Sequence, residues 1–526
     1  MSTADVMIVG AGPTGLTLAI DLARRGVDAV LVEAETELPR QSRGKGLQPR
    51  SLEVFDDLGV VDTLLEQGEW RQDITLYADQ RRLARLPAGL AEPRPDLPYP
   101  NILMIPQWRI TAVLEERLGE LGGKIRFGTR LAGFTAGSDG VRAELVTADG
   151  GHEELEVRYL VGCDGGRSAV RRTLGIEFAG VSREHQRYLL GDVTVPGWDP
   201  EGSGVVRSHA WMGRDGSFLG LAGLPGTGQW QIGASIGPDD DLEPSLDVLQ
   251  RLWDERTGHT DVRLTDPTWL SNFKVNVRMV DEYRHGRVLL AGDAAHVHPP
   301  TGGQGMNTGI QDAYNLGWKL VACLRGADDA LLDSYQAERL PIARGVLEKS
   351  TDILDVVTSR NPLVAFAVRR ILLPLLRRPA VNRALTSRVS QIDVGYRSGP
   401  LTEDGVTGGR VRAGDRAPDA LIDAVSNESV RLHDVLRGPH WTLLLVGDSA
   451  ARHLDITALP DGVTVAVIAG SARPGVRVLQ DRDRTFHRAY RAASGTALLI
   501  RPDGYVAWRA EAPDHRAVLA HLPSGE

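Results

Sequence analysis

Cysteine is scarce in this sequence, with only Cys163 and Cys323 among 526 residues. Two cysteines so far apart provide neither a disulfide framework nor the close pairs of a cysteine-bound metal. This scarcity is typical of proteins kept in a reducing compartment, and a cytoplasmic location is expected. The start of the chain also has no cationic stretch followed by an apolar run, so no secretory signal is expected.

Long apolar runs and blocks of positive charge are missing as well. The most apolar long segment, 363–376, is interrupted by Arg369 and Arg370 and falls short of the roughly 18 residues that cross a bilayer. A core or interface helix is expected there, and no membrane contact. The net charge of -9, without a lysine–arginine cluster, argues against a nucleic-acid partner, whose binding surface would be basic. The 42% hydrophobic and 25% charged content fits a globular protein of about three domains.

A glycine-rich segment near the start of the chain, GAGPTG at 10–15, has the spacing of a dinucleotide fingerprint. It lies between an apolar run at 6–9 and an amphipathic stretch at 16–25, which predicts strand, tight turn and helix. A second strand at 29–32 ends in Glu33, about 20 residues on, where a carboxylate accepts from a ribose hydroxyl. A glycine-rich turn without a ligand is the alternative, but this context favours nucleotide binding. The candidate residues are Gly10, Gly12, Pro13, Thr14, Gly15, Glu33 and Ala34.

Two later segments place aspartate beside glycine. Residues 159–168 read YLVGCDGGRS and residues 292–296 read GDAAH. The apolar run before GDAAH predicts a short strand, and the residues after it predict a loop and then a helix over 308–324. Asp293 is therefore expected at a strand end, next to a glycine-rich loop and a helix N-terminus.

The three segments, in this order, resemble the class A flavoprotein monooxygenases, most closely the branch that hydroxylates phenols and aromatic polyketides, as in antibiotic biosynthesis. The resemblance covers nearly the whole chain, and PTGGQGMNTGIQDA at 300–313 is specific to it. It implies that Asp293 holds the ribitol of FAD, and that Asp164 is tied to both FAD and the nicotinamide cofactor. The FAD-binding residues it implies are Arg43, Gln107, Leu131, Asp164, Asp293, Pro299, Gly305, Met306 and Asn307.

Simpler roles stay open for four of these residues. Arg43 suits pyrophosphate, but it could lie on a solvated charged loop. Gln107 could begin a helix, and Asp164 could cap a turn. Leu131, which follows the strand-like residues 125–130, is expected to contact adenine through its backbone and to bury its side chain in the core.

His296 and His298 raise the alternative of a metal site, because imidazoles two apart near Asp293 are possible zinc or iron ligands. We reject it and expect no metal. Two prolines follow at once, the Gly-Asp match already accounts for Asp293, and an isolated histidine pair is not a specific signature. A structural or flavin-adjacent role is favoured.

The segment order predicts an α/β fold. A Rossmann-like FAD-binding domain is expected from 1–180 and 270–345, and an antiparallel sheet domain for substrate from 76–99 and 181–269. A helical linker over 346–407 follows, with a kink or break expected at Pro341 in the preceding helical pattern. Residues 408–526 resemble a thioredoxin-like domain. Since no cysteine lies beyond 323, thiol exchange is excluded there, and a structural or oligomerisation role is favoured.

The resemblance implies chemistry that resides mostly in cofactors. NAD(P)H, with NADPH favoured, would reduce FAD, dioxygen would add at flavin C4a, and the hydroperoxide would pass oxygen to an aromatic ring. No second GxGxxG occurs, so the nicotinamide cofactor is expected to bind transiently on the FAD domain. The catalytic residues are unknown. Candidates for contact with a small-molecule aromatic substrate are His209, Trp211, Phe218 and Gln231, each equally consistent with a core position.

Two other functions remain open. A Baeyer–Villiger oxygenase would use the same flavin to insert oxygen beside a polyketide ketone, and the sequence does not separate it from a hydroxylase. A flavin-binding assembly protein would use the C-terminal domain for docking. A homo-oligomer is compatible with all three.

Overall fold

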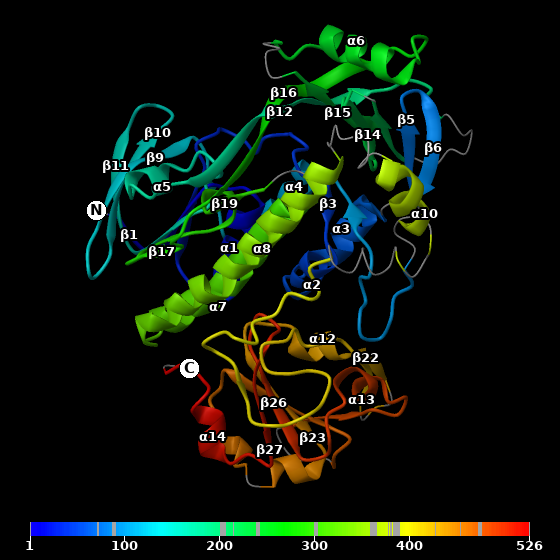
Figure 1. The fold of residues 1–526 in the computed structure, drawn as a ribbon. Coiled ribbons are helices and arrows are strands. Elements are labelled where there is room, and N and C mark those ends of the chain that lie inside the picture. Colours follow the sequence, from blue (N-terminus) through cyan, green and yellow to red (C-terminus); the bar gives the residue numbers. More distant parts are fainter. Residues whose placement is uncertain are drawn as a thin grey trace.

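The computed structural model describes residues 2–70, 73–86, 91–199, 207–213, 215–237, 242–298, 303–357, 366–376, 378, 381, 390–424, 426, 428–452, 454–471 and 476–524. Within these residues, the strands form three eight-stranded sheets and a small three-stranded sheet. The first two large sheets and their helices lie together at the top of Figure 1, and the third forms the C-terminal domain below them. The expected mixed α/β fold is confirmed.

The first sheet contains the parallel strands that the fingerprint predicts. Its central order is β18 (Val288–Leu290), β11 (His152–Gly162), β1 (Ser2–Val9) and β2 (Ala29–Val32), all parallel. Such strands are buried on both faces and therefore consist of nearly continuous apolar residues. The sheet is completed by β8 (Ile125–Arg126), β9 (Thr129–Ala136), β10 (Val141–Thr147) and β17 (Arg284–His285).

Helices cover this sheet and connect it to the rest of the molecule. They are α1 (Pro13–Ala23), α2 (Pro49–Asp57), α3 (Val61–Gln67), α4 (Gln107–Glu120), α5 (Ala169–Thr173), α7 (Gly305–Leu324) and α8 (Asp333–Val357). Helix α7 is buried along most of its length. Pro341 lies inside the continuous helix α8, so the break expected there does not occur, while the alternative of a kink stays a prediction. Pro341 is exposed, whereas the neighbouring Glu338 and Arg339 are buried in ion pairs that hold this turn of the helix against α7.

Two separate parts of the chain supply the strands of the second sheet. Its order is β19 (His296–Val297), β16 (Thr265–Met279), β12 (Ala179–Thr194), β15 (Gln229–Ile236), β14 (Phe218–Leu224), β13 (Ser208–Met212), β5 (Ile74–Ala78) and β6 (Arg81–Leu86). One face is covered by α6 (Leu246–Thr257) (Figure 1). The pairs are antiparallel as expected, except that β5 runs parallel to β13 because it enters from the first domain and not through a hairpin. A three-stranded sheet of β3 (Gly46–Leu47), β7 (Leu103–Met104) and β4 (Glu69–Trp70) lies between the two units.

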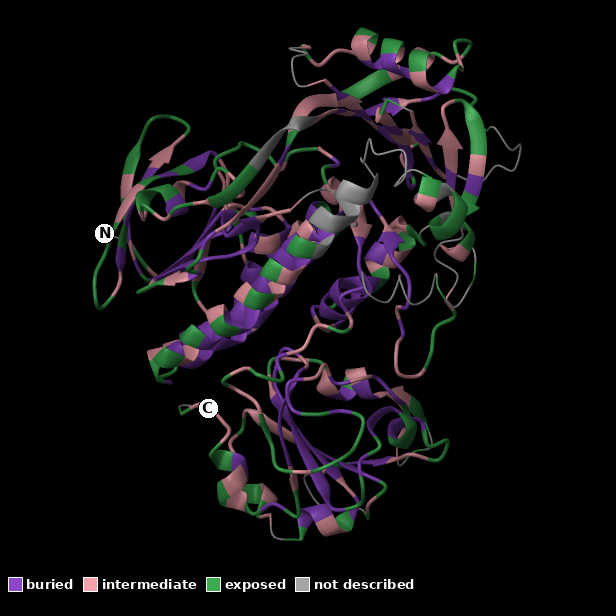
Figure 2. Ribbon diagram, viewed as in Figure 1, coloured by how far each residue is buried: buried purple, intermediate pink, exposed green. Residues whose placement is uncertain are grey.

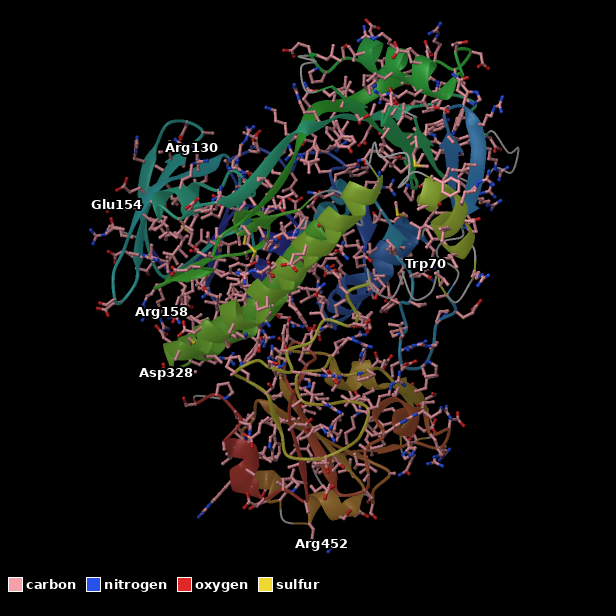
Figure 3. All side chains as sticks on the ribbon, in the orientation of Figure 1. Trp70, Arg130, Glu154, Arg158, Asp328 and Arg452 are labelled. Carbon is pink, nitrogen blue, oxygen red and sulfur yellow. The ribbon has the colours of Figure 1, made fainter. Side chains whose placement is uncertain are left out.

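The C-terminal domain is a small α/β unit, and its central strands are buried (Figure 2). Its strand order is β20 (Glu403–Asp404), β27 (Val506–Glu511), β26 (Thr496–Ile500), β23 (Trp441–Val446), β24 (Val463–Ile468), β25 (Arg477–Gln480), β21 (Leu421–Ala424) and β22 (Ser429–Arg431). The helices are α12 (Leu432–Leu436), α13 (Thr485–Tyr490) and α14 (His515–Leu519). Arg452 lies at the outer end of this domain (Figure 3).

The connection between α8 and the C-terminal domain is only partly helical in the described residues. It contains a π-helical turn at Val368–Leu372 and α10 (Leu373–Leu376), while 390–402 has no helix. Phe366, Ile371 and Leu372 are exposed, so a core position for this apolar segment is wrong for these three side chains. No helix in the described ranges is long and apolar enough to span a membrane.

Candidate functional site

The three glycine-containing segments leave the first sheet at one edge. Val9 is in register with Gly162, and Gly162 with Leu290, at the carboxyl ends of three adjacent parallel strands. The backbone continues this pairing, since Cys163 N donates to Val9 O at 2.8 Å and Ala291 N donates to Gly162 O at 3.0 Å. Residues separated by nearly the whole domain in sequence therefore meet at the place where open α/β sheets bind their ligands.

The fingerprint turn is closed so tightly that only glycine fits at two positions. Gly10 has φ +101°, and a β-carbon there would lie 2.6 Å from Cys163 O. A β-carbon on Gly15 would lie 2.0 Å from Gly10 O. Gly12, in contrast, would contact no atom of the described chain within 4 Å, and the α1 N-terminus it precedes has no side-chain cap. The amides at this helix end are thus available for an anion.

Glu33 fixes this turn from the end of β2. Its Oε2 accepts a hydrogen bond from Ala11 N at 2.8 Å, and its Oε1 accepts one from Glu35 N at 3.1 Å. Ala34 beside it is exposed. Leu131 lies within β9, not after a strand, and is buried in the core, because the preceding strand ends early and β9 begins at Thr129.

The Gly-Asp segment contacts the fingerprint directly. A β-carbon on Gly292 would lie 2.6 Å from Thr14 Oγ1, and one on Gly309 of α7 would lie 2.5 Å from the same atom. Asp293 is exposed while both of its chain neighbours are buried. Although the residue is open to solvent, the atoms packed around it reduce its hydration and raise the pKa of Asp293, and the nearby charges of His296 and Arg43 oppose this shift. The segment therefore presents a carboxylate beside the turn that carries the open helix amides.

A loop at 42–48 is held against the start of α7. Asn307 Oδ1 accepts from Gln48 N at 2.8 Å, and its Nδ2 donates to Gly46 O at 3.0 Å. Gln107, which begins α4, accepts from Gly44 N at 2.9 Å through its Oε1. Both side chains therefore position the loop.

The residues at the start of α7 complete the surroundings of this loop. A β-carbon on Gly44 would lie 3.1 Å from Met306 Sδ, and one on Gly305 would lie 3.7 Å from His298 Cδ2. Pro299 lies outside the described residues.

Asp164 caps a helix, the simpler role considered for it. Its Oδ2 accepts from Ala169 N at 2.6 Å and Val170 N at 3.2 Å, at the start of α5. Its Oδ1 is buried and has no hydrogen-bond partner within the described part of the chain. One carboxylate oxygen thus holds the local fold while the other is available to a ligand. Burial raises the pKa of the adjacent Cys163 thiol well above its usual value, so this cysteine is a neutral packing group.

His296 and His298 form a hydrogen-bonded chain that ends on α7. His296 Nδ1 lies 2.8 Å from His298 Nε2, and His296 Nε2 lies 2.6 Å from Asp312 Oδ2. Asp312 also pairs with Arg339 of α8 at 2.7 Å. Burial alone would raise the pKa of Asp312, but the positive charges of Arg339 and His296 outweigh burial and lower this pKa to about 2. Asp312 and Arg339 were not singled out from the sequence, because nothing in their spacing indicates that α7 and α8 bring them together.

Replacing His298 with asparagine is expected to weaken the loss of stability on acidification. Burial and His296 lower the pKa of His298 from 6.5 to about 3, against the opposing charge of Asp312. Between these values the unfolded chain binds a proton that the folded chain does not, so the free energy of unfolding falls as pH falls. Urea unfolding at pH 6.5 and pH 5 should show a smaller difference in the variant. His285→Asn, at an exposed ring, controls for the loss of a histidine; an unchanged difference in His298→Asn contradicts the assignment.

The four substrate candidates divide between the two faces of the second sheet. His209 and Trp211 are buried under α6, where Trp211 stacks on Tyr77 at 4.7 Å and contacts Trp253 of α6 at 5.7 Å. They occupy the core position that the sequence left open. Phe218 and Gln231 lie on the opposite face, which is turned toward the 42–48 loop.

Gln231 and its register partner Asp192 form the polar part of that face. Phe218 and Tyr188 form its aromatic part. The two rings meet edge to face at 6.4 Å. Sequence alternation could indicate that positions 209 and 211 share a face, but it could not indicate which face α6 would cover.

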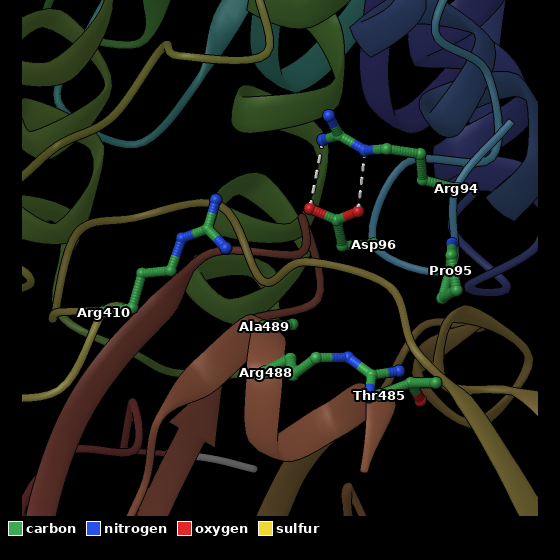
Figure 4. Close-up of a pocket in the computed structure, with 7 residues that line it drawn as sticks. All are labelled: Arg94, Pro95, Asp96, Arg410, Thr485, Arg488 and Ala489. Carbon is green, nitrogen blue, oxygen red and sulfur yellow. Dashed lines mark hydrogen bonds and ion pairs between the residues drawn. The ribbon is translucent and has the colours of Figure 1, made fainter. Parts of the chain in front are cut away.

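A cavity of about 310 Å³ lies elsewhere, between the β6–β7 connection and the C-terminal domain (Figure 4). Arg94 and Asp96 pair across its mouth, with Nε to Oδ1 at 3.0 Å. A neighbouring cavity of about 700 Å³ shares this lining. Neither is lined by a residue of the three glycine segments, so both lie apart from those segments.

Comparison with known proteins places the whole chain. A family model described as "FAD binding domain" matches residues 3–350, and one described as "Aromatic-ring hydroxylase, C-terminal" matches residues 410–523. The chain is 40% identical to a flavin-dependent monooxygenase of Mycobacteroides abscessus, over 98% of this chain and 99% of that protein. It is 35% identical to a rifampicin monooxygenase of Streptomyces venezuelae, over 99% of this chain and 98% of that protein. The solved structure of an anhydrotetracycline hydroxylase of Streptomyces rimosus matches this fold with a TM-score of 0.77 and 31% identity. The match covers 97% of this chain and 96% of that chain.

Proposed function

Because this chain belongs to the aromatic-ring hydroxylases and is an FAD-dependent monooxygenase of that family, we propose that it consumes NAD(P)H to hydroxylate a phenol or an aromatic polyketide. NADPH is the favoured reductant. Residues 1–180 with 270–345 bind FAD, and residues 76–99 with 181–269 bind substrate. Two relatives are named a rifampicin monooxygenase and an anhydrotetracycline hydroxylase, which supports a substrate of the aromatic polyketide class.

The observation that carries this proposal is the meeting of the three glycine segments at one sheet edge, facing the second sheet. The α1 amides near Gly12 bind the pyrophosphate, Glu33 the ribose and Asp293 the ribitol, while Asp164 Oδ1 takes a further polar group. The donors and acceptors present at each position match those parts of FAD. When bound, FAD would supply the oxygen-transfer chemistry.

The protein's own residues bind, orient and exclude water. The second sheet covers the site with the face that carries Phe218, Tyr188 and Gln231, and aromatic rings on that face suit a flat aromatic substrate. The 42–48 loop, tied to Asn307 and Gln107, closes the other side. Excluding water here protects a reactive oxygen donor from decay.

Stopped-flow reduction tests this function. The FAD-loaded protein, mixed anaerobically with NADPH, should lose its flavin absorbance, and phenols or aromatic polyketides that bind should raise the reduction rate. NADH should act more slowly. Failure of both nicotinamides to reduce the flavin, with every aromatic tested, would contradict NAD(P)H use and favour another reductant.

A further inference from the structure

Gln231 of the second sheet binds both ends of one turn in the 42–48 loop. Its Oε1 accepts from Lys45 Nζ at 2.6 Å, and its Nε2 donates to the backbone oxygen of Ser42. Arg43 and Gly44 lie between these two attachment points. A single side chain of the sheet therefore bridges the turn that carries Arg43.

Asp192 lies directly beside this bridge. It is the register partner of Gln231 on one side and of Trp269 on the other, so the three side chains form one row across β15, β12 and β16. The row faces away from α6, because Leu189, Gly191 and Val193 of the same strand pack under that helix. Asp192 therefore points toward the 42–48 loop.

The Asp192 carboxyl is only 1% exposed, and it is surrounded by groups that favour its charged form. Burial raises the pKa of Asp192, and four neighbouring groups oppose that shift: Trp269, Ser42, Lys45 and Gln231. Two of these four belong to the loop, and Lys45 supplies the positive charge. A buried carboxylate is costly unless such partners stay close.

We propose that Asp192 is a positioning residue that holds the Ser42–Lys45 turn against the second sheet. If the turn moved away, Asp192 would lose the Lys45 charge and the Ser42 hydroxyl and would remain buried with too few partners. The cost of that state keeps the loop in one place.

The consequence for the site is the placement of Arg43. Its charge acts on Asp293, the carboxylate of the Gly-Asp segment. A loosened turn would release Arg43 from this position. This step rests on the proposed function only in taking the loop to lie against FAD.

Limited trypsin digestion of the full-length protein without added FAD tests the turn itself. Asp192→Leu should raise the rate of cleavage after Arg43 by about tenfold, because the turn loses the attraction between Lys45 and a buried carboxylate, which is comparable in strength to a charged hydrogen bond. Asp192→Asn, which keeps an acceptor oxygen, should restore most of the protection. Asp215→Asn, which removes a carboxylate from a distant turn of the same sheet, should be cleaved after Arg43 at the wild-type rate.

A double variant separates positioning from general stability. Lys45→Met should raise cleavage after Arg43, and adding Asp192→Leu should raise it no further, because both act through one contact. FAD titration should show a dissociation constant about tenfold higher in Asp192→Leu. Additive effects, or unchanged cleavage in a variant with wild-type thermal stability, would overturn the proposal. Failure of the wild type to bind FAD would instead count against the proposed function, while the cleavage comparison would still decide the role of Asp192.

Discussion

Replacing Arg501 with leucine is expected to lower the free energy of unfolding by about 3 to 5 kcal/mol, the cost of breaking a buried ion pair. Arg501, at the end of β26, donates to Glu338 of α8 at 2.5 and 3.0 Å and also pairs with Asp503. Lys319 of α7 approaches the same Glu338 at 2.8 Å. All four side chains are essentially unexposed, so leucine would leave two carboxylates facing one lysine in the core.

Urea unfolding of the full chain measures this effect. Arg452→Leu, at an exposed arginine of the same domain, is the control and should change stability by less than about 0.5 kcal/mol. Because the network joins the C-terminal domain to α7 and α8, the Arg501 variant should also bind FAD more weakly. Wild-type stability in Arg501→Leu would show that the C-terminal domain is not fastened by this network.

Replacing Gly309 with alanine is expected to weaken FAD binding by more than about tenfold, although it adds one methyl group. The new β-carbon would lie 2.5 Å from Thr14 Oγ1 and 3.0 Å from Gly292 Cα, and the latter is backbone that cannot rotate away. Helix α7 must then move from α1, and overpacking of this kind costs about 1 to 3 kcal/mol. The displacement separates the fingerprint from the Gly-Asp segment.

Gly345→Ala is the matched control, because a β-carbon on this glycine of α8 would meet no described atom within 4 Å. It should raise stability by up to about 1 kcal/mol through helix propensity. Fluorescence titration with FAD measures both variants. Equal FAD affinity in Gly309→Ala and the wild type would mean that the close packing of α1 and α7 does not shape the site.

Much of the fold follows from local sequence pattern. The strand, turn and helix around Gly10 and the strand before Gly292 follow from apolar runs bounded by glycine, and both are present. Local pattern was sufficient for these elements because each depends on residues adjacent in sequence. The meeting of Cys163 with Gly10 depends instead on the long-range pairing of β1 with β11.

Other features depend on contacts that local pattern does not encode. His209 and Trp211 fit either face of a strand, and only the position of α6 assigns them to the core. Glu338 and Arg501 are separated by 163 positions, and their pairing depends on how the C-terminal domain docks. Asp192 has no motif around it, and its burial beside the 42–48 loop comes from the register of three strands.

The buried network also bears on the role of the C-terminal domain. Arg25 donates to Pro439 O at 2.8 Å, Arg50 donates to Asp503 O at 2.7 Å, and Trp318 of α7 meets Trp441 edge to face at 5.4 Å. These contacts lie within one chain. They support a structural role, in which the C-terminal domain packs against α7 at Trp318.

The source of the transferred oxygen atom tests the central proposal most directly. The FAD-loaded protein should be supplied with NADPH, heavy-isotope dioxygen and an aromatic substrate on which it turns over, and the product analysed by mass spectrometry. We expect one labelled oxygen in a new ring hydroxyl and none from labelled water. A label placed in an ester would favour Baeyer–Villiger insertion, whereas a label from water, or product formed without dioxygen, would contradict monooxygenation and favour a flavin dehydrogenase.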